Sequence, residues 1–245
     1  MFVLPGLLFR REDARLIGFF VVYGANPDNN PQLAAALASA RKAGVPKAII
    51  EAAVARGQGR SSGGAALESV TFEAIIPPSV ALIVETETDS RLRLLQDLNL
   101  IIKKGKGTPG TSKFFFSRLG RVVFEKNESG IGAEQIMDEA LEAGAEDLED
   151  DEEGNIVVWT QPNHTSQVCR SVASAFGLKV ISSDIIWSPN EDTKVRVDSS
   201  PQLADLADLL VKLKEHPDVQ AVYSNVSRGT MSDDEWATLE ENLDA

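Results

Sequence analysis

Residues 134–160, EQIMDEALEAGAEDLEDDEEGNIVVWT, decide the fold of the middle of this chain. Apolar residues recur at helical spacing until Gly144, which ends the pattern as glycine often does after a helix. An acidic strand near Asp147 follows, and a turn at Glu153-Gly154-Asn155 leads into an apolar strand at Ile156–Thr160. The stretch therefore predicts a helix followed by a β-hairpin.

The flanking segments extend this pattern on both sides. Val122–Glu125 predicts a strand before the helix. Thr165–Phe176 predicts a second helix, and Lys179–Trp187 predicts a closing strand. The resulting order, βαββαβ, indicates a ferredoxin-like domain at residues 120–190.

Residues 65–119 combine strands with one helix. Val70–Ile76 and Val80–Thr86 predict two strands joined at Pro77-Pro78. Phe114–Phe116 predicts a further strand. Between the second and third of these strands, Asp89 or Ser90 can cap a helix that carries Leu92, Leu95, Leu98 and Ile102 and ends near Gly105.

Residues 191–229 repeat this combination after the ferredoxin-like segment. Lys194–Val197 and Val219–Val226 predict strands. Between them Ser200-Pro201 begins a helix, and His216-Pro217 ends it. Because the two flanking segments resemble one another, we expect them to form one domain with the ferredoxin-like domain inserted in it.

Two short helices are predicted near the start of the chain. Asn30 is a suitable N-cap, Pro31 suits the first helical position, and Gly44 ends the helix. Pro46 opens a second helix, and the run Gly57–Gly64, rich in glycine and serine, predicts a linker. Residues 14–24 fit a third helix and a strand equally well.

The chain thus has an α+β fold made of several parts, as its length of 245 residues also suggests. The predicted parts are a basic helical domain at 1–64, a discontinuous α+β domain at 65–119 and 191–229, the inserted ferredoxin-like domain at 120–190, and an acidic, frayed tail at 230–245.

Charge is unevenly divided along the chain, whose net charge is −13. Residues 1–64 hold eight Lys and Arg against four Asp and Glu, a net +4, whereas the remainder holds 16 against 33, a net −17. Cations near the two helix ends and the linker can follow a phosphate backbone without reading bases. A solvated helix face explains the same charges, and composition does not decide between the two. The candidate nucleic-acid-binding residues are Arg41, Lys42, Lys47, Arg56 and Arg60.

Three patterns that could indicate chemistry have simpler structural explanations. Gly105–Gly110 matches G-x-G-x-x-G, but a helix precedes it and a strand follows, the reverse of the order in a dinucleotide site. The carboxylates of Glu146–Glu153 surround a predicted turn, where they are solvated. His164 and Cys169 lack a third orienting group, so Cys169 is expected to be a core residue. We expect no enzymatic activity, no metal site and no cofactor.

Composition sets further limits. An apolar fraction of 43% with 25% charged residues is typical of a globular protein, and one cysteine cannot form an intramolecular disulfide. No stretch approaches the roughly 20 apolar residues of a membrane helix, so no membrane association is expected. We expect a monomer.

Several blocks of the sequence resemble the YebC family, whose eukaryotic branch includes the translational activator of cytochrome c oxidase subunit I. In the first part these are Asn30-Pro31-x-Leu33, Ala40-Arg41-Lys42-Ala43, Pro46-Lys47 and Arg56-Gly57-x-Gly59. Later blocks are Ala81–Glu85, Thr88-Asp89-x-Arg91-x-Arg93, Asp138–Asp147 and Val222–Asn225. Two segments depart from the family pattern. Met1–Gly24 is largely apolar where members are basic, and Ile76–Ser79 replaces a glycine-rich turn.

The resemblance implies three domains and a non-enzymatic role in gene expression. Bacterial members are described as DNA-binding transcriptional regulators or as translation factors at stalled ribosomes, and mitochondrial members support synthesis of an organelle-encoded subunit. We therefore expect a translational activator of the mitochondrial matrix that contacts the ribosome and ribosomal or messenger RNA. The alternatives are a DNA-binding transcriptional regulator and a protein adaptor that has lost nucleic-acid binding. Residence in the cytoplasm is compatible with the sequence.

Overall fold

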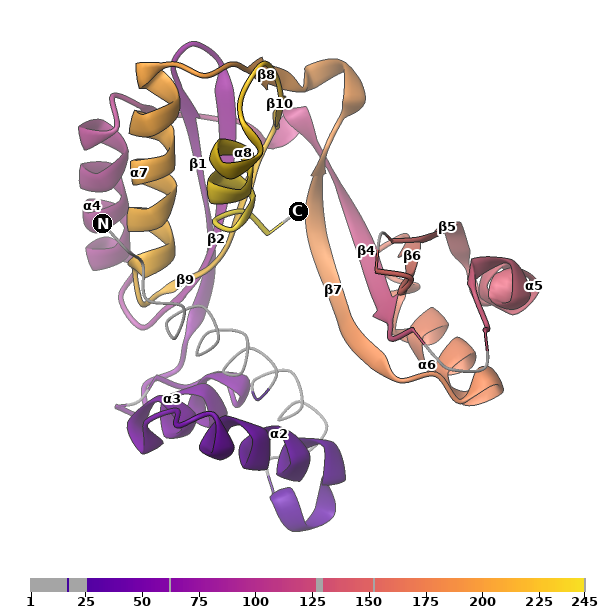
Figure 1. Ribbon diagram of the computed structural model, residues 1–245. Helices are drawn as coiled ribbons and strands as arrows, with labels where there is room; N and C mark the ends of the chain where they lie inside the picture. Colours follow the sequence, from indigo (N-terminus) through magenta and orange to yellow (C-terminus); the bar gives the residue numbers. More distant parts are fainter. Residues whose placement is uncertain (1–16, 18–25, 62, 127–129, 152, 245) are drawn as a thin grey trace. The chain divides into compact units, whose positions relative to one another are not determined.

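The computed structural model describes residues 17, 26–61, 63–126, 130–151 and 153–244 (Figure 1). The chain forms two compact units, Met1–Val70 with Glu85–Asp97, and Thr71–Val84 with Leu98–Ala245. The border between these units passes through two strands and a helix that the sequence analysis placed within one domain. The units therefore do not test the predicted domain boundaries, which stay predictions. The prediction for residues 14–24 lies outside the described residues except at Ile17, which is helical and fully buried.

The first unit contains a helical hairpin made of α2 (Pro31–Lys42) and α3 (Lys47–Gly57), preceded by the short 3-10 turn η1 (Pro27–Asn29). Both helices confirm the prediction. The Asn30 side chain accepts a hydrogen bond from the N–H of Leu33 at 3.1 Å, which satisfies an N–H that the helix leaves unpaired. A small apolar core holds the hairpin together and consists of Ile17, Leu33, Leu37, Ala40, Val45, Ile50 and Ala53.

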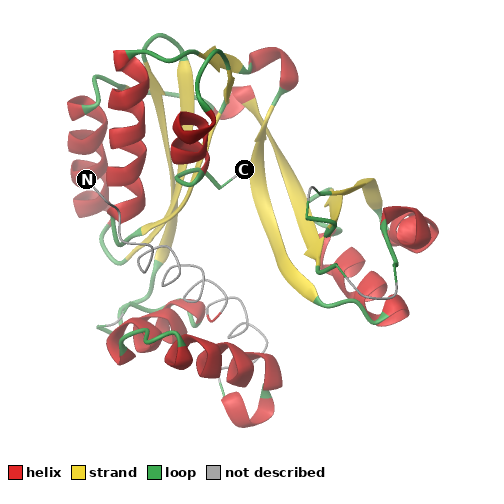
Figure 2. Ribbon diagram, viewed as in Figure 1, coloured by secondary structure: helices red, strands yellow, loops and turns green. Residues whose placement is uncertain are grey.

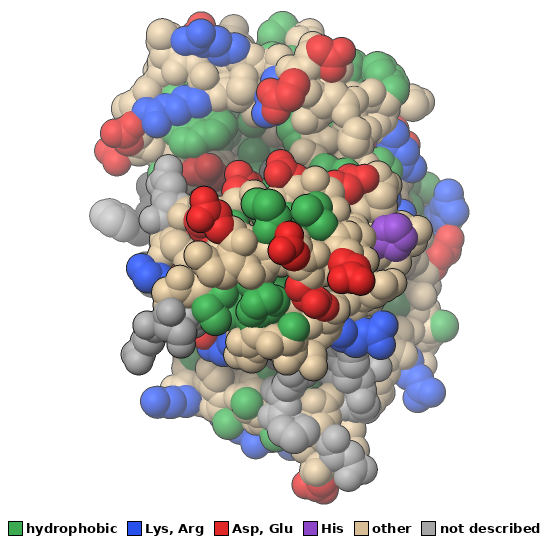
Figure 3. All heavy atoms as spheres, turned by 90° about the vertical axis from the view of Figure 1, so that its right-hand side faces the viewer, with side chains coloured by type: hydrophobic (Ala, Val, Ile, Leu, Met, Phe, Trp, Pro, Cys, Tyr) green, Lys and Arg blue, Asp and Glu red, His purple; other side chains and the backbone are tan. Residues whose placement is uncertain are grey.

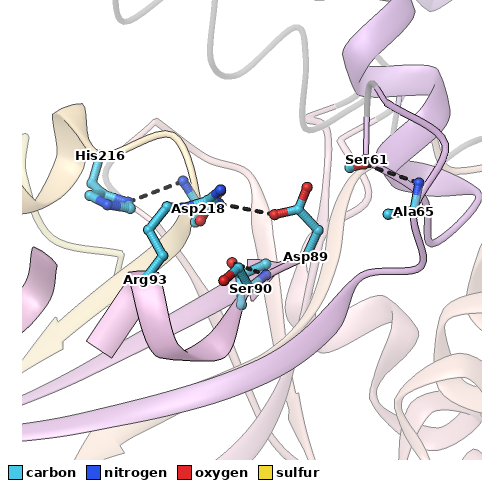
Figure 4. Close-up of polar contacts among 8 residues, drawn as sticks. Ser61, Ala65, Asp89, Ser90, Arg93, His216 and Asp218 are labelled. Atoms are coloured by element: carbon cyan, nitrogen blue, oxygen red, sulfur yellow. Dashed lines mark hydrogen bonds and ion pairs between the residues drawn. The ribbon is translucent and has the colours of Figure 1, made fainter. Parts of the chain in front are cut away.

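The predicted linker after α3 is a hydrogen-bonded turn, so that prediction was wrong. Arg60 and Ala66 form an antiparallel bridge, and the N–H of Ser61 donates to the carbonyl of Ala65 at 2.7 Å. The Ser61 hydroxyl in turn accepts from the N–H of Ala65 (Figure 4). Gly59 has a φ of 71°, so glycine here permits a left-handed tight turn instead of providing a loose connection.

A four-stranded sheet has the order β3-β1-β2-β9 (Figure 2). Its strands are β1 (Glu68–Ile76), β2 (Val80–Thr88), β3 (Thr108–Pro109) and β9 (Val219–Ser224). The accompanying helices are α4 (Arg91–Lys104) and α7 (Pro201–Glu215), and a parallel strand pair joins β8 (Val195–Val197) to β10 (Val226–Arg228). The side chain of Ser200 caps α7 as predicted, by accepting from the N–H of Leu203.

The predicted helix is present as α4, and two of its four named apolar residues, Leu98 and Ile102, lie in the core. Leu94, Leu98 and Ile102 are fully buried, whereas Leu92 is 70% exposed. This helix is rich in leucine and carries two apolar stripes of the same period, so periodicity alone does not select between them. Packing buries the stripe that passes through Leu94.

The second unit contains the sheet β5-β6-β4-β7, in which all neighbours are antiparallel. With two helices the chain order is βαββαβ, and this topology is ferredoxin-like, as predicted. The elements are β4 (Phe116–Phe124), α5 (Ala133–Ala143), β5 (Ala145–Asp150), β6 (Ile156–Thr160), α6 (Thr165–Phe176) and β7 (Val180–Pro189). Gly120 is needed in β4, since a Cβ atom there would lie 1.8 Å from the hydroxyl oxygen of Thr165.

The predicted strand at Phe114–Phe116 is instead the 3-10 turn η2 (Lys113–Phe115), and only Phe116 belongs to a strand. The Glu73 carboxylate accepts hydrogen bonds from the N–H groups of Ser112 and Lys113 at 2.7 and 2.9 Å. Two adjacent N–H groups can converge on one carboxylate only where the backbone turns. The turn therefore depends on a residue about 40 positions away in the sequence.

The acidic C-terminal segment is docked on the second unit, so the prediction of a frayed tail was wrong. It forms α8 (Asp233–Glu240), whose Leu239 is fully buried. The Asp244 carboxylate pairs with the Lys214 ammonium group and accepts from the N–H of Val222 at 2.8 Å. Acidic composition suggested solvation, but several of these carboxylates have specific partners.

Replacing Leu239 with alanine tests this docking. If Leu239 anchors α8, the substitution should lower the free energy of unfolding by about 2–4 kcal/mol, because it leaves a cavity in a packed site. Urea unfolding followed by circular dichroism measures the change. Glu240→Ala, at the exposed neighbouring position, is the control. Equal stabilities of the two variants would show that the segment is not docked.

Glu73 should make stability depend on pH. Burial raises the pKa of its carboxyl group, but the two N–H donors and the nearby Lys113 ammonium outweigh burial and hold the pKa below the ordinary 4.5. A carboxyl group with a lowered pKa in the folded state stabilises the fold above its unfolded pKa, and this contribution disappears as pH falls through the folded pKa. Glu73→Gln should therefore be less stable than the wild type at pH 7, and the difference should shrink below pH 4.5. A difference independent of pH in urea unfolding would contradict this role.

Candidate nucleic-acid interface

The hairpin arranges the five predicted cations in two groups. Arg41 and Lys42 lie in the last turn of α2, and Lys47 is the first residue of α3. These three, called here the corner group, surround the short connection between the helices. Arg56 and Arg60 lie at the other end of α3. At 1.5 Å per residue, the helix separates Lys47 from Arg56 by about 14 Å.

The corner group is exposed and weakly engaged. The Lys47 side chain is 88% exposed, and its ammonium lies 3.4 Å from the Glu51 carboxylate one helical turn later. Such an exposed pair contributes about 0.5 kcal/mol or less and is readily broken. Arg41 and Lys42 are also exposed, and within the described ranges neither forms an ion pair. All three can therefore turn toward an anionic partner without breaking a strong contact.

Arg41 and Lys42 also have a structural effect. Cations in the last turn of a helix interact favourably with the partial negative charge of the helix C-terminus. This effect accounts for the position of these two residues on a solvated helix face without any ligand.

Arg56 is engaged within the first unit. Its guanidinium lies 3.8 Å from the carboxylate of Glu87 on β2, and both side chains are about two-thirds buried. Burial raises the pKa of Glu87, while the charge of Arg56 partly opposes that shift. Arg56 thus offsets a desolvated carboxylate and links α3 to β2. Arg60 is exposed in the turn that follows α3.

An open groove lies between α2 and α3 next to the corner group. Its volume is about 640 Å³. Apolar side chains of Leu37, Val45 and Ile50 line it, and Arg41 and Lys47 stand among the polar residues at its edge. Sequence analysis did not find this groove, because the same apolar residues also belong to the core pattern of the hairpin.

The acidic charge of the chain is concentrated in the second unit. The face that α5 presents shows carboxylates around exposed apolar side chains (Figure 3). Met137 and Leu141 on α5 are 40% and 48% exposed, and Glu134, Asp138 and Glu142 are exposed beside them. A phosphate backbone would be repelled from this surface.

The three other patterns agree with their structural explanations. Gly105–Gly110 follows the end of α4 and contains the short strand β3, so no helix begins after these glycines as a dinucleotide site requires. Asp151 lies in the turn after β5, where a hydrogen bond from the Asn155 side chain and bonds from backbone N–H groups lower its pKa. Cys169 is buried in the core of the ferredoxin-like domain, and burial raises the pKa of its thiol.

Two further observations concern metals and membranes. Within the described ranges, no cluster of three or more His, Cys, Asp or Glu side chains could hold a metal ion. Among the helices of the described residues, none is long and apolar enough to cross a membrane.

Two protein-family models match the sequence of this chain. The model for the N-terminal domain of TACO1/YebC proteins matches residues 14–60, and the model for their second and third domains matches residues 67–226. The chain belongs to the TACO1/YebC family. Its fold is accordingly an N-terminal helical domain with two α+β domains, and members of this family are regulatory proteins without enzymatic activity.

Individual relatives support the same assignment. A protein of Bifidobacterium animalis subsp. lactis is 36% identical over 221 residues, which cover 89% of this chain and 84% of the relative. A protein of Hyphomonas neptunium is 35% identical over 238 residues, covering 95% and 90%. Both carry the name "Probable transcriptional regulatory protein".

A solved structure is also similar to this TACO1/YebC member. The crystal structure of the conserved hypothetical protein Aq1575 from Aquifex aeolicus superposes with a TM-score of 0.63 and 27% identity, covering 91% of each chain. These relatives are bacterial, so they support the family and give no support to its mitochondrial branch.

Charge reversal tests whether Arg56 has a structural role that the exposed cations lack. Arg56→Glu places a second carboxylate near Glu87, so it should lower the free energy of unfolding by about 1 kcal/mol and reduce the melting temperature by a few degrees. Arg60→Glu, at an exposed position beyond the end of α3, should change stability by less than about 0.5 kcal/mol. Thermal unfolding followed by circular dichroism measures both. Equal melting temperatures for the two variants would contradict a structural role for Arg56.

Proposed function

We propose that the chain regulates gene expression by binding the sugar–phosphate backbone of a nucleic acid through the corner group. One observation carries this proposal. In a chain of net charge −13, three exposed cations, Arg41, Lys42 and Lys47, gather at one corner of a short helical hairpin. Exposed cations that release counterions from phosphates supply most of the affinity of non-specific binding.

Transcriptional regulation is the candidate that the names of the relatives support. Reading a DNA sequence requires side chains that reach base edges in a groove. The sequence of α2, PQLAAALASARK, consists largely of alanine before its terminal cations and offers few such side chains. Regulation at DNA would therefore depend on phosphate contacts, with DNA shape providing the selectivity.

Translational regulation is the second candidate, and the same alanine-rich helix favours it. Structured RNA is recognised largely by shape and by contacts to phosphates and hydroxyls, which do not require base-reading side chains on a helix. In this role the chain binds the ribosome, ribosomal RNA or messenger RNA as a monomer. Activity in the mitochondrial matrix rests on the family resemblance alone.

A third candidate, the protein adaptor, is favoured by the acidic surface of α5. Met137 and Leu141 are exposed there among carboxylates. An apolar patch surrounded by negative charge suits contact with a basic protein. This surface and the corner group are separate features, so an adaptor role is compatible with nucleic-acid binding. Co-purification of a protein partner that persists after nuclease treatment distinguishes it.

The binding proposal predicts a loss of affinity on charge reversal. A variant with Arg41→Glu, Lys42→Glu and Lys47→Glu should bind both duplex DNA and structured RNA at least about tenfold more weakly at 100 mM salt. The slope of log K against log salt should also decrease by about 2–3, since each lost phosphate contact contributes about 0.9. Fluorescence anisotropy across a salt series measures both quantities.

The matched control carries Lys103→Glu and Lys104→Glu, which reverse exposed cations at the end of α4. If the triple variant binds as the wild type does, or if the control loses as much affinity, the corner group is not the contact. Footprinting on promoter DNA with competitor present, and co-sedimentation with ribosomes before and after nuclease, then distinguish transcription from translation.

A further inference from the structure

The groove between α2 and α3 is lined by apolar side chains and by the cations Arg41 and Lys47. Its apolar floor consists of the core residues Leu37, Val45 and Ile50, which are only 6–7% exposed, and of the half-buried Val54 and Ala55. Arg41 lies at the end of α2 and Lys47 at the start of α3, so the two cations stand at the same end of the hairpin. The exposed Glu51 and Gln58 add polar groups at the edge.

The size and charge of the groove limit what can occupy it. A volume of about 640 Å³ lies within the 300–1,000 Å³ typical of small-molecule sites and exceeds what one phosphate group needs. The two cations favour an anion, and the apolar floor favours a group that loses water at little cost. A ligand that satisfies both has an uncharged ring beside a phosphate.

We propose that the groove accepts one unstacked nucleobase of a single-stranded segment, while Arg41 and Lys47 hold the adjacent phosphates. This inference rests on the proposed nucleic-acid binding and specifies its substrate class. A base inside a duplex must first be unpaired and unstacked, at a cost of a few kcal/mol, before it can enter such a site. The chain therefore prefers single-stranded or bulged nucleic acid to a perfect duplex.

The chemistry of the floor also sets the selectivity. Aliphatic side chains contact any base through its face, and the described lining has no aromatic ring on which a base could stack. Contact of this kind tolerates all four bases. Selectivity in the groove is consequently for strandedness, with little dependence on sequence.

Filling the groove tests the inference. Ala55 lines it from α3, so Ala55→Phe places a ring where the base is proposed to lie. Ala48 is exposed on the same helix and does not line the groove, which makes Ala48→Phe the matched control. If Ala55→Phe fails to fold, as judged by circular dichroism, the smaller Ala55→Leu takes its place.

The probes are a labelled 12-nucleotide single strand of mixed sequence and the corresponding blunt duplex, with oleate as an unlabelled competitor. The wild type should bind the single strand at least about tenfold more tightly than the duplex, as expected for an unpairing cost of a few kcal/mol. Ala55→Phe should reduce binding of the single strand to the level of the duplex and leave the duplex unaffected. Ala48→Phe should change neither.

Each alternative outcome has a distinct meaning. Equal affinity of the wild type for both probes, unchanged in Ala55→Phe, overturns the groove proposal while the phosphate contact stands. If neither probe binds the wild type, the proposed function itself fails. Displacement of the single strand by oleate that Ala55→Phe abolishes identifies the groove as an acyl-anion site and overturns the nucleobase assignment.

Discussion

The pairing of β2 with β9 is the constraint on which the arrangement of this chain depends. Asn225 is fully buried at the end of β9, and its side-chain oxygen accepts from the N–H of Ala81, a residue 144 positions earlier, at 2.8 Å. Its amide nitrogen donates to the carbonyl of Thr193 at 2.6 Å. Removing one partner from such a buried network leaves groups unsatisfied and costs about 1–3 kcal/mol per group.

This clamp closes the long loop that contains the ferredoxin-like domain. It holds the start of β2 and the end of β9 together with Thr193, which lies just after the last strand of the ferredoxin-like segment. The docked C-terminal segment adds to the same strand, because both the N–H and the carbonyl of Val222 bond to Asp244. Covering these groups also reduces the exposed edge of β9, where unpaired backbone groups invite association with other chains.

Separation of charge explains how an acidic protein can belong to a family of regulators of gene expression. The cations of the hairpin project from a small alanine-rich scaffold, which allows a close approach to a phosphate backbone. In the proposed binding mode, the carboxylates of the second unit would repel phosphates and favour contact at the hairpin. Arg56 shows that a cation identified in the sequence is not always available to a ligand, since its guanidinium already pairs with the partly buried carboxylate of Glu87.

By itself the sequence determined the helices of the hairpin, the βαββαβ order and the family, because caps, periodicity and turn residues act over a few positions. Asn30, Gly144 and Ser200 each mark a helix end through local backbone chemistry, and the structure confirms all three. The sequence also placed the basic charge in the first domain. Only the tertiary structure decided which leucines of α4 are buried, that Glu73 bends the chain at Lys113, and that the acidic tail is docked. It also separated Arg56 from the corner group and formed the groove beside Arg41. The physical reason is the same in each case, since these features arise from contacts between residues far apart in the sequence or on different helices, which periodicity and composition do not record.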